Sequence, residues 1–430
     1  MRIEDITKFN PWWTTGKVPA DLALQYKRKV FHEIVNTLQR RQSTLIYGLR
    51  RTGKTTLMYQ VIEKLLAEGV KQEAIIYFSF DEITFDLKDV LETYEKVVLR
   101  KKFDEVENRL YIFLDEVQKV KDWENKIKTY YDLYPKIKFF LSGSASVAIA
   151  RKARESLAGR IISIRVDPLD FVEFLELNNL DVAAIRKQPD LWKRDIMPLF
   201  YRYLMYGTFP ELSREEDASF AKRYIIDTVI DRVIYKDIAT EFAIKDVELL
   251  KHLVLLVSSK PGMLISFKEL AKNFARDERT IANYFEYLEY AMIVRFVFNY
   301  RGSPLASLRK SKKVYLTTPN LAYALQPEPS QLMPLLLENL VAMAEDAKYF
   351  YRNSFEVDFI FPESQMGIEV KKGFGEEKQL RKLRKRFSFN GIVITMEDES
   401  EGEFNHVPAW KLLIGIEAPI KSRDGSKSGL

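Results

Sequence analysis

The sequence of 430 residues contains no cysteine and only three histidines. Without cysteine there are no disulfides, thiolate zinc sites or cysteine nucleophiles. The three histidines, His32, His252 and His406, are expected on the surface or at helix caps rather than in a metal site. No apolar run is long enough to span a membrane, and residues 1–5 do not have the pattern of a signal peptide. These absences predict a cytoplasmic protein with no membrane partner.

The composition, 47% hydrophobic and 30% charged residues, is that of an ordinary globular protein. At this length more than one core is needed, so we expect roughly two to four domains. The net charge of +6 permits nucleic acid as a partner without requiring it.

One stretch, Gly48-Leu49-Arg50-Arg51-Thr52-Gly53-Lys54-Thr55, fits the phosphate-loop pattern G-x-x-x-x-G-K-[ST] at every fixed position. A strand is expected over 43–47 and a helix over 56–67, which is the context that the motif needs. Glycines let the backbone curl around phosphates, and N–H groups at a helix N-terminus favour anions. Lys54 is expected to reach the β- and γ-phosphates, and the Thr55 hydroxyl to hold Mg²⁺. The predicted ATP-binding residues are Gly48, Arg51, Thr52, Gly53, Lys54, Thr55, Thr56 and Ser142.

A second motif lies about sixty residues downstream, where an apolar run from Leu110 ends in Asp115 and Glu116. A buried parallel strand would deliver these acids to the carboxyl edge of the sheet, where ligands bind in open α/β folds. Asp115 is expected to hold Mg²⁺ through water, and Glu116 to polarise the attacking water.

Two further residues are weaker candidates for the same site. Ser142 follows a strand expected over 137–141 and is placed to sense the γ-phosphate, or is a capping serine in a turn. Arg160 precedes a strand expected over 161–166 and is a candidate arginine finger, acting in cis or in trans. Arginine is common at strand starts, so a purely local role stays open for Arg160.

The rest of the N-terminal half is expected to be structural. Asn10-Pro11-Trp12-Trp13 forms an aromatic arm that should pack onto the following domain, and a helix is expected over 21–41. From 168 to about 241 the pattern is helical and is typical of a lid.

Residues 247–298 predict helix, short helix, helix and strand, the layout of a winged helix-turn-helix. In a DNA-binding interpretation the recognition helix starts with Arg276, Arg279, Thr280, Asn283 and Tyr284, and Arg301 lies near the wing. The same helix carries four acidic residues, Asp277, Glu278, Glu286 and Glu289. Contact with protein is therefore as well supported as contact with DNA.

A hairpin is expected around Pro362-Glu363-Ser364-Gln365, with Asp358 opposite Glu369 and Glu356 opposite Lys371. Alternation places these four side chains on one face, and Val357, Phe359, Ile368 and Val370 on the other. A helix over 335–344 presents Glu338 to the same region. Carboxylates and a lysine on one face are what Mg²⁺-dependent phosphodiester cleavage needs, but geometry alone favours simple cross-strand ion pairs.

The region around this hairpin is basic. It contains Lys371, Lys372, Lys378, Arg381, Lys382, Arg384, Lys385 and Arg386. These side chains either bind a phosphate backbone or form a solvated helix face.

Taken together, the motifs resemble a family, the archaeal P-loop ATPases of AAA type with a restriction-endonuclease-like C-terminal region. The resemblance covers most of the chain. It rests on Asn10 to Trp13, Gly48 to Thr55, Leu114 to Gln118, Ser142-Gly143-Ser144, Leu157 to Arg160, Pro168 to Phe171 and Glu369-Val370-Lys371. It implies that Asp358, Glu369 and Glu338 hold metal and that Lys371 is catalytic, as in the PD-(D/E)xK pattern, although no proline precedes Asp358.

The expected fold class is α/β, divided into a P-loop ATPase domain (1–166), a helical lid (167–241), a winged helix (242–302), a restriction-endonuclease-like domain (303–420) and a disordered tail (421–430). The leading hypothesis is an ATP- and Mg²⁺-dependent ATPase of AAA type, coupled to DNA binding and, as a further expectation, DNA cleavage. The alternative is a nucleotide-dependent regulatory switch with a non-catalytic nuclease-like scaffold that contacts protein. An ATPase that acts with a partner nuclease, and a homo-oligomeric assembly, also stay open.

Overall fold

The computed structural model describes residues 2–81, 85–143, 153, 155–308, 311–375 and 377–416. Ser144 lies outside the described residues, and so does the tail 421–430, which the sequence analysis expects to be disordered. The chain divides into two units, Met1–Asp167 with Tyr290–Met292, and Pro168–Glu289 with Ile293–Leu430. We call them the N-terminal and the C-terminal unit. Across the described ranges, no helix combines the length and the apolar character that crossing a membrane requires.

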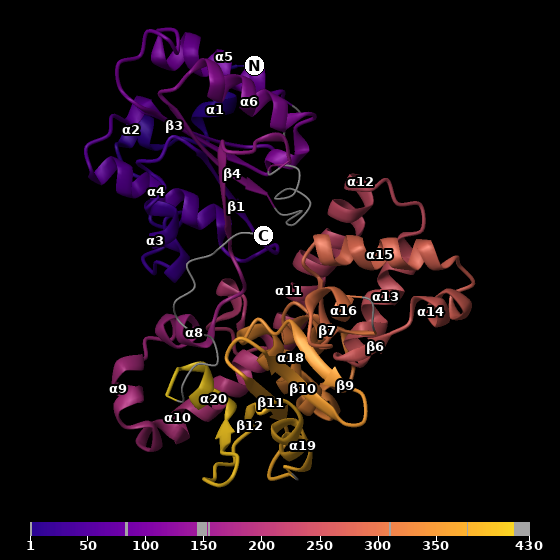
Figure 1. Ribbon diagram of the computed structural model, residues 1–430. Coiled ribbons are helices and arrows are strands. Elements are labelled where there is room, and N and C mark those ends of the chain that lie inside the picture. The colour runs from indigo at the N-terminus through magenta and orange to yellow at the C-terminus, as the bar shows by residue number, and fades with distance from the viewer. Residues whose placement is uncertain are drawn as a thin grey trace. The chain divides into compact units, whose positions relative to one another are not determined.

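The N-terminal unit is built on a parallel sheet of five strands in the order β2-β3-β4-β1-β5 (Figure 1). Four of the five strands confirm those expected above at 43–47, 110–115, 137–141 and 161–166. Their bounds are β1 (Ser43–Tyr47), β2 (Ile75–Ser79), β3 (Leu110–Asp115), β4 (Ile137–Gly143) and β5 (Ile161–Arg165). Because all pairs are parallel, the residues that follow β1, β3 and β4 lie at the same edge of the sheet.

Helices cover both faces of this sheet, because apolar residues alternate and fill two separate cores. Ile46 and Phe113 belong to the core under α3 (Lys29–Val35) and α4 (Lys54–Ala67). Their neighbours Leu45 and Ile112 belong to the core under α5 and α6. The remaining helices and helical turns of this unit are α1 (Glu4–Thr7), α2 (Trp12–Thr15), η1 (Gln72–Ala74), α5 (Leu87–Thr93), η2 (Tyr94–Leu99), η3 (Val117–Lys119) and α6 (Trp123–Leu133).

The aromatic arm packs against the sheet as expected. Trp12 is fully buried, and both Trp12 and Trp13 donate their indole N–H groups to the carbonyl oxygen of Ile75. Asn10 is also buried and bonds to both backbone groups of Tyr77. The arm is therefore an integral part of the N-terminal unit.

The helix expected over 21–41 is wrong in its extent, since α3 covers only Lys29–Val35. The segment before it is held out of a helix by tertiary hydrogen bonds. Gln60 donates to the carbonyl oxygens of Leu24 and Tyr26 at 2.5 and 2.8 Å, and so takes up groups that a helix would use internally. Arg28 has extended backbone and reaches the phosphate loop, where it donates to the Thr52 carbonyl oxygen at 2.9 Å.

The C-terminal unit begins with the helices expected over 168–241. In chain order its helices and helical turns are α8 (Phe171–Leu177), α9 (Val182–Lys187), α10 (Pro189–Arg202), η4 (Tyr203–Gly207), η5 (Pro210–Leu212), α11 (Ala218–Ile225), η6 (Ile226–Ile230), η7 (Arg232–Ile238), α12 (Ala239–Glu241), α13 (Val247–Ser259), α14 (Phe267–Asn273), α15 (Glu278–Tyr290), α16 (Pro304–Leu308), α17 (Pro319–Leu325), η8 (Pro329–Leu332), α18 (Met333–Ala344), α19 (Lys378–Phe387) and α20 (Ala409–Leu413).

The strands of this unit form one mixed sheet in the order β13-β12-β11-β10-β9-β7-β8-β6. Their bounds are β6 (Met263–Ile265), β7 (Val294–Asn299), β8 (Lys312–Leu316), β9 (Tyr349–Arg352), β10 (Glu356–Phe361), β11 (Met366–Val370), β12 (Asn390–Thr395) and β13 (His406–Pro408). The β7–β9 pair joins strands from the expected winged helix and nuclease-like regions. These two regions therefore share a sheet, and a boundary near 302 stays a prediction.

The expected hairpin is present with the expected register. Phe359 pairs with Ile368, and Phe361 pairs with Met366. Extended by one residue, this register places Asp358 opposite Glu369, as the sequence predicts.

Candidate functional site

The phosphate-loop motif joins the end of β1 to the start of α4. Gly53 has a φ of 88°, a left-handed conformation that glycine adopts without strain. A side chain at Gly48 would place its Cβ 2.2 Å from the carbonyl oxygen of Val166, so only glycine fits there. Inside the loop, Thr52 Oγ1 donates to the Leu49 carbonyl oxygen at 2.9 Å. The two motif glycines are thus explained by backbone geometry.

Lys54 lies at the centre of the loop. Its side chain is buried, and Nζ donates to the carbonyl oxygens of Gly48 at 3.0 Å and Leu49 at 2.9 Å. Thr55 and Arg51 are exposed, and Thr56 is half-buried in the first turn of α4. An ammonium group inside a loop at a helix N-terminus attracts anions to this edge of the sheet.

Asp115, at the end of β3, collects four neutral hydrogen-bond donors. Thr55 Oγ1 donates to Oδ2 at 2.7 Å, and the Tyr77 hydroxyl donates to the same oxygen at 2.8 Å. On the other side, Ser142 Oγ and the Glu116 N–H donate to Oδ1, the latter at 3.0 Å. Residues from β2, β3, β4 and α4 therefore converge on one carboxylate.

Glu116 follows directly and has a φ of 55°. A left-handed glutamate is strained by about 1–2 kcal/mol, and such strain is often found at functional sites. The Gln118 amide donates to Glu116 Oε2 at 2.5 Å, which fixes the direction of the carboxylate.

This donor set fits Mg²⁺ and a nucleoside triphosphate. A hydroxyl and a carboxylate are hard oxygen ligands of the kind that Mg²⁺ binds, and Thr55 Oγ1 lies 2.7 Å from Asp115 Oδ2. The neighbouring Lys54 ammonium has the charge needed for phosphate oxygens.

Tyr77 is a member of this site that the sequence analysis missed. Burial first, and then the nearby Asp115 charge, raise the pKa of Tyr77 well above its usual value. The phenol therefore keeps its proton and remains a donor to Asp115. Burial likewise raises the pKa of the adjacent Tyr59 to about 12. The only sequence signal was a tyrosine within the otherwise apolar β2.

Arg160 is not brought to the phosphate loop. Its carbonyl oxygen accepts from the N–H of Ser43, at the start of β1, whereas the loop follows the end of that strand. Its guanidinium pairs with Asp132 through two hydrogen bonds of 2.8 and 3.2 Å. A role in cis is therefore wrong for this arrangement, because the residue lies at the opposite edge of the sheet.

The second group of candidate residues lies in the C-terminal unit and contains a lysine that the sequence analysis missed. Lys313 Nζ lies 3.0 Å from Glu356, 3.4 Å from Glu338 and 3.7 Å from Asp358. Glu369 is buried and pairs with Lys371 at 2.7 Å. We call Lys313, Glu338, Glu356, Asp358, Glu369 and Lys371 the C-terminal cluster.

The ionisation of this cluster reflects burial and mutual charge. Burial and the Asp358 charge raise the pKa of Glu338 to about 7, although Lys313 opposes the shift. Burial and Asp358 also raise the pKa of Glu369 to about 7, against the effect of Lys371. For Lys313, burial alone would lower the pKa, but three surrounding carboxylates outweigh it and raise the pKa to about 12. Lys313 therefore stays charged.

These residues do not fit a divalent metal in the way that the family resemblance implies. The expected ligands Glu338, Asp358 and Glu369 are brought into one region, but an ammonium group lies against each of them. Within the part of the chain that the structure describes, no three His, Asp or Glu residues are grouped so that they could hold one metal ion.

A local irregularity changes which side chains of β10 share a face. The pairing of β10 with β9 shifts by one residue between Val357 and Ile360. Val357 and Ile360 consequently both lie in the core with Leu383 of α19. Phe359 instead contacts the ring of Tyr315, with centroids 5.8 Å apart. The expectation that Val357 and Phe359 share a face is wrong, because a bulge interrupts the alternation.

The residues expected to contact DNA are largely engaged within the C-terminal unit. Arg276 pairs with Asp246 at 2.7 Å, and Thr280 bonds to Asp277 at the helix N-terminus. Arg301 donates to the carbonyl oxygen of Arg352. On α19, Leu380 and Leu383 face the core, and the exposed basic residues are Lys378, Arg381, Lys382, Lys385 and Arg386.

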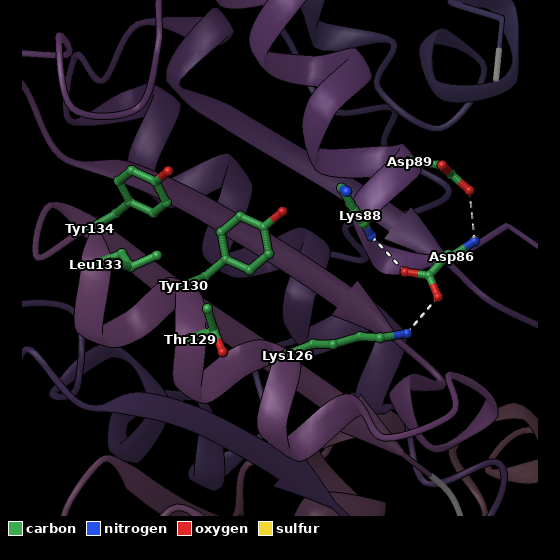
Figure 2. A pocket seen from close by; sticks show the side chains of 8 residues that line it. All are labelled: Asp86, Lys88, Asp89, Lys126, Thr129, Tyr130, Leu133 and Tyr134. Carbon is green, nitrogen blue, oxygen red and sulfur yellow. Dashed lines mark hydrogen bonds and ion pairs between the residues drawn. The ribbon is translucent and has the colours of Figure 1, made fainter.

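A separate pocket of about 560 Å³ lies in the N-terminal unit between the start of α5 and one side of α6 (Figure 2). Lys126 and Asp86 form an ion pair across it. Its other lining residues are Lys88, Asp89, Thr129, Tyr130, Leu133 and Tyr134. No phosphate-loop residue lines it, and neither do Asp115 and Glu116, so it is distinct from the nucleotide site.

Two known domain families match successive stretches of this chain. Residues 40–175 match the AAA domain family, so the chain carries a probable P-loop NTPase domain of AAA type. Residues 197–332 match a domain of unknown function (DUF8612). The parallel five-stranded sheet and the phosphate loop both lie in the part covered by the first match.

The curated relatives are uncharacterized proteins. Two from Methanocaldococcus jannaschii are each 26% identical, one over 85% of this chain and 87% of the relative, the other over 90% and 86%. One from Haemophilus influenzae is 25% identical over 58% of this chain and 60% of its own length. The two archaeal matches extend along most of the chain, and all three relatives are described as uncharacterized.

Two solved structures resemble this chain at low sequence identity. The Saccharomyces cerevisiae Hsp104–ADP complex is 17% identical, with a TM-score of 0.32 over 63% of this chain and 39% of that one. AMPPCP-bound DnaA from Aquifex aeolicus is 19% identical, with a TM-score of 0.27 over 65% of this chain and 92% of that one. Scores this low do not bear on the activity of the present chain.

Proposed function

We propose that the N-terminal unit binds ATP with Mg²⁺ and hydrolyses it. The observation that carries the proposal is the convergence of Thr55, Tyr77 and Ser142 on Asp115, at the end of a strand, next to a phosphate loop that holds the Lys54 ammonium. Thr55 and Asp115 would hold Mg²⁺, the latter through water, and the ion would neutralise developing phosphate charge. The match of residues 40–175 to the AAA domain family also supports ATP binding and hydrolysis.

The chain's own residues take distinct roles in this proposal. Lys54 binds the β- and γ-phosphates, and the loop N–H groups of Gly48, Arg51, Thr52, Gly53 and Thr56 complete the phosphate cradle. Glu116, oriented by Gln118, polarises the attacking water. Ser142 couples the γ-phosphate position to Asp115, because its hydroxyl already bonds to that carboxylate.

Arg160 enters this proposal only in trans. Since its own phosphate loop lies at the far edge of the sheet, an arginine finger would have to come from another copy of the chain. Release of Arg160 from Asp132 would have to accompany assembly of such a homo-oligomer. Mixing Arg160→Ala and Glu116→Gln chains tests this: partial recovery of hydrolysis supports action in trans, and none removes Arg160 from the mechanism.

For the C-terminal unit we propose a division into a helical lid (167–241), a winged helix (242–302) and a nuclease-like region (303–420). We propose that the last two regions bind DNA. The exposed basic face of α19 supports DNA binding, because clustered lysines and arginines on one helix face can follow a phosphate backbone. The family resemblance adds DNA cleavage by Asp358, Glu369, Lys371 and Glu338, and the hairpin register agrees with that arrangement. An ammonium group lies against each of the three carboxylates, however, so we leave metal-dependent cleavage out of this proposal.

The second candidate is a nucleotide-dependent switch whose C-terminal unit is a non-catalytic scaffold. Two observations favour it. Arg276 is paired with Asp246 within the protein, and Lys313 occupies the C-terminal cluster with an ammonium group.

Two experiments test these proposals. ATP hydrolysis should require Lys54, and a Lys54→Ala chain that hydrolyses ATP like wild type would contradict the first. Cleavage of linear, single-stranded and branched DNA should be measured with Mg²⁺ or Mn²⁺, with and without ATP, beside Asp358→Ala and Lys371→Ala. Cleavage that both variants lose supports a nuclease, whereas intact ATP hydrolysis without cleavage supports the switch.

A further inference from the structure

Lys313 holds the position in the C-terminal cluster where a metal ion would be expected. Its ammonium lies within 4 Å of carboxylates on two different elements, Glu356 and Asp358 on β10 and Glu338 on α18. The side chain is only 6% exposed, so the ammonium is not a surface charge that approaches the cluster occasionally.

Both oxygens of Asp358 and one oxygen of Glu338 already face donors. Glu338 Oε1 accepts from the Tyr315 hydroxyl at 2.5 Å as well as from Lys313. Asp358 Oδ2 accepts from the Val370 N–H at 2.9 Å, and its Oδ1 faces Lys313. A divalent ion needs these same oxygens at about 2.0–2.1 Å, and would have to displace donors to reach them.

Lys313 is also held in place by its strand. β8 pairs with β6 and β7 on both sides, and Lys313 itself pairs with Leu264 and Val297. The ammonium lies 5.3 Å from the centroid of the Phe350 ring, which adds a cation–π contact. A lysine on an inner strand with these contacts cannot swing into solvent without disturbing the sheet.

The lysine connects parts of the sheet that are not neighbours. β8 and β10 are separated by β7 and β9, three steps of about 4.8 Å in a flat sheet. Lys313 nevertheless contacts Glu356, and the Tyr315 ring contacts the Phe359 ring. The sheet therefore curves, so that side chains of β8 and β10 meet on its concave, inner face. The ion pairs lie across this inner face.

We propose that Lys313 is the built-in cation of the C-terminal cluster, so that the cluster joins β8, β10 and α18 and does not bind a divalent metal. The cluster then stabilises the fold of the C-terminal unit instead of cutting phosphodiesters. This inference goes beyond the proposed function, because it gives the cluster a structural role and leaves DNA binding by the C-terminal unit open. It is independent of ATP hydrolysis in the N-terminal unit.

The test is to measure Mn²⁺ binding in the absence of nucleotide, using calorimetry and electron paramagnetic resonance. The proteins compared are wild type, Asp358→Asn, Lys313→Met and Lys312→Met. Lys313→Met keeps the length of the side chain and removes its charge. It should gain a Mn²⁺ site at least tenfold tighter than any binding by wild type. Lys312→Met is the matched control, because the Lys312 ammonium lies over the Phe296 ring at 4.0 Å and is not among the groups of the cluster; it should gain none.

Wild type and Asp358→Asn should bind Mn²⁺ equally. This comparison decides the matter even if Lys313→Met does not fold. A wild-type site that Asp358→Asn removes would overturn the inference, as would a folded Lys313→Met chain with no new site. ATP hydrolysis is measured on the same samples: its absence in wild type would contradict the proposed ATPase and leave the Mn²⁺ result for Lys313 standing.

Discussion

The two carboxylate centres of this chain differ in what surrounds them. Asp115 accepts from neutral donors, the hydroxyls of Thr55, Tyr77 and Ser142 and one backbone N–H. In the C-terminal cluster, by contrast, carboxylates face the ammonium groups of Lys313 and Lys371.

The difference matters because hydroxyl donors orient a carboxylate without cancelling its charge. Hydroxyl groups carry no charge of their own to oppose an incoming cation, and they can rotate when a cation arrives. An ammonium group neutralises the carboxylate beside it and repels a second cation. Similar motifs of acidic residues therefore lead to opposite expectations, a metal-binding centre in one unit and a metal-free ion-pair network in the other.

The largest expected effect is loss of ATP turnover at the first centre. Lys54→Ala should abolish nucleotide binding, since the buried ammonium is the loop's phosphate ligand. Glu116→Gln should bind ATP but lower kcat by about 10²–10⁴-fold, because the amide cannot polarise water. Nucleotide binding by fluorescence and phosphate release measure the two steps separately, and unchanged hydrolysis in Glu116→Gln would contradict its role.

The next effect is a pH dependence of stability from the second centre. Glu338 and Glu369 have pKa values raised from the usual 4.5 to about 7. The folded form therefore holds their protons more tightly, and this contribution is present below pH 4.5 and lost as the pH rises through 7. The free energy of unfolding of the C-terminal unit should fall over this window by on the order of 1–3 kcal/mol.

Urea denaturation at pH 5 and pH 7.5 measures this change. Glu338→Gln, which stays neutral, should flatten the dependence, and Glu363→Gln at the exposed hairpin turn is the control. An equally steep dependence in Glu338→Gln would show that the cluster does not titrate as described.

The third effect concerns one of the neutral donors to Asp115, the Tyr77 hydroxyl. Tyr77→Phe deletes a buried hydroxyl bonded to Asp115, which should cost about 1–2 kcal/mol of stability. It should also change the Mg²⁺ concentration needed for half-maximal hydrolysis by a few-fold, since Asp115 is less firmly oriented. Tyr59→Phe is the comparison, because the Tyr59 hydroxyl hydrogen-bonds to Tyr77 and interacts with Asp115 only through its charge. An identical Mg²⁺ requirement in wild type and Tyr77→Phe would remove Tyr77 from the site.

The smallest expected effect concerns basic residues that face solvent instead of carboxylates. Lys378→Gln and Lys385→Gln on α19 should each weaken DNA binding by a few-fold and reduce the slope of log affinity against log salt by about 0.9. Arg384→Gln should matter less, because Arg384 pairs with Glu403 within the protein. Fluorescence anisotropy over a salt series gives the slopes. DNA binding that does not depend on salt would favour the protein-contact interpretation of this unit.

The sequence predicts the first centre well because its motifs are local. A glycine-rich loop and an apolar run that ends in Asp115 and Glu116 determine their own backbone, and parallel pairing then brings them to one edge. The hairpin register could also be predicted, since the turn determines which residues face each other.

The remaining features depend on contacts between distant segments. Tyr77 and Lys313 look like ordinary strand residues in the sequence, and only the assembled sheets bring them to the carboxylates. The bulge in β10 and the short α3 also follow from tertiary pairing, because the partners that impose them, β9 and Gln60, are not encoded nearby. The acidic motifs could therefore be found in the sequence, but the charged or neutral groups that surround them in the fold could not.

The most direct test is the number of Mn²⁺ ions bound per chain in the presence of a non-hydrolysable ATP analogue. Wild type should bind one ion that requires the nucleotide, Asp115→Asn should lose it, and Asp358→Asn should keep it. A second ion that disappears in Asp358→Asn, or a nucleotide-dependent ion that survives in Asp115→Asn, would contradict the account.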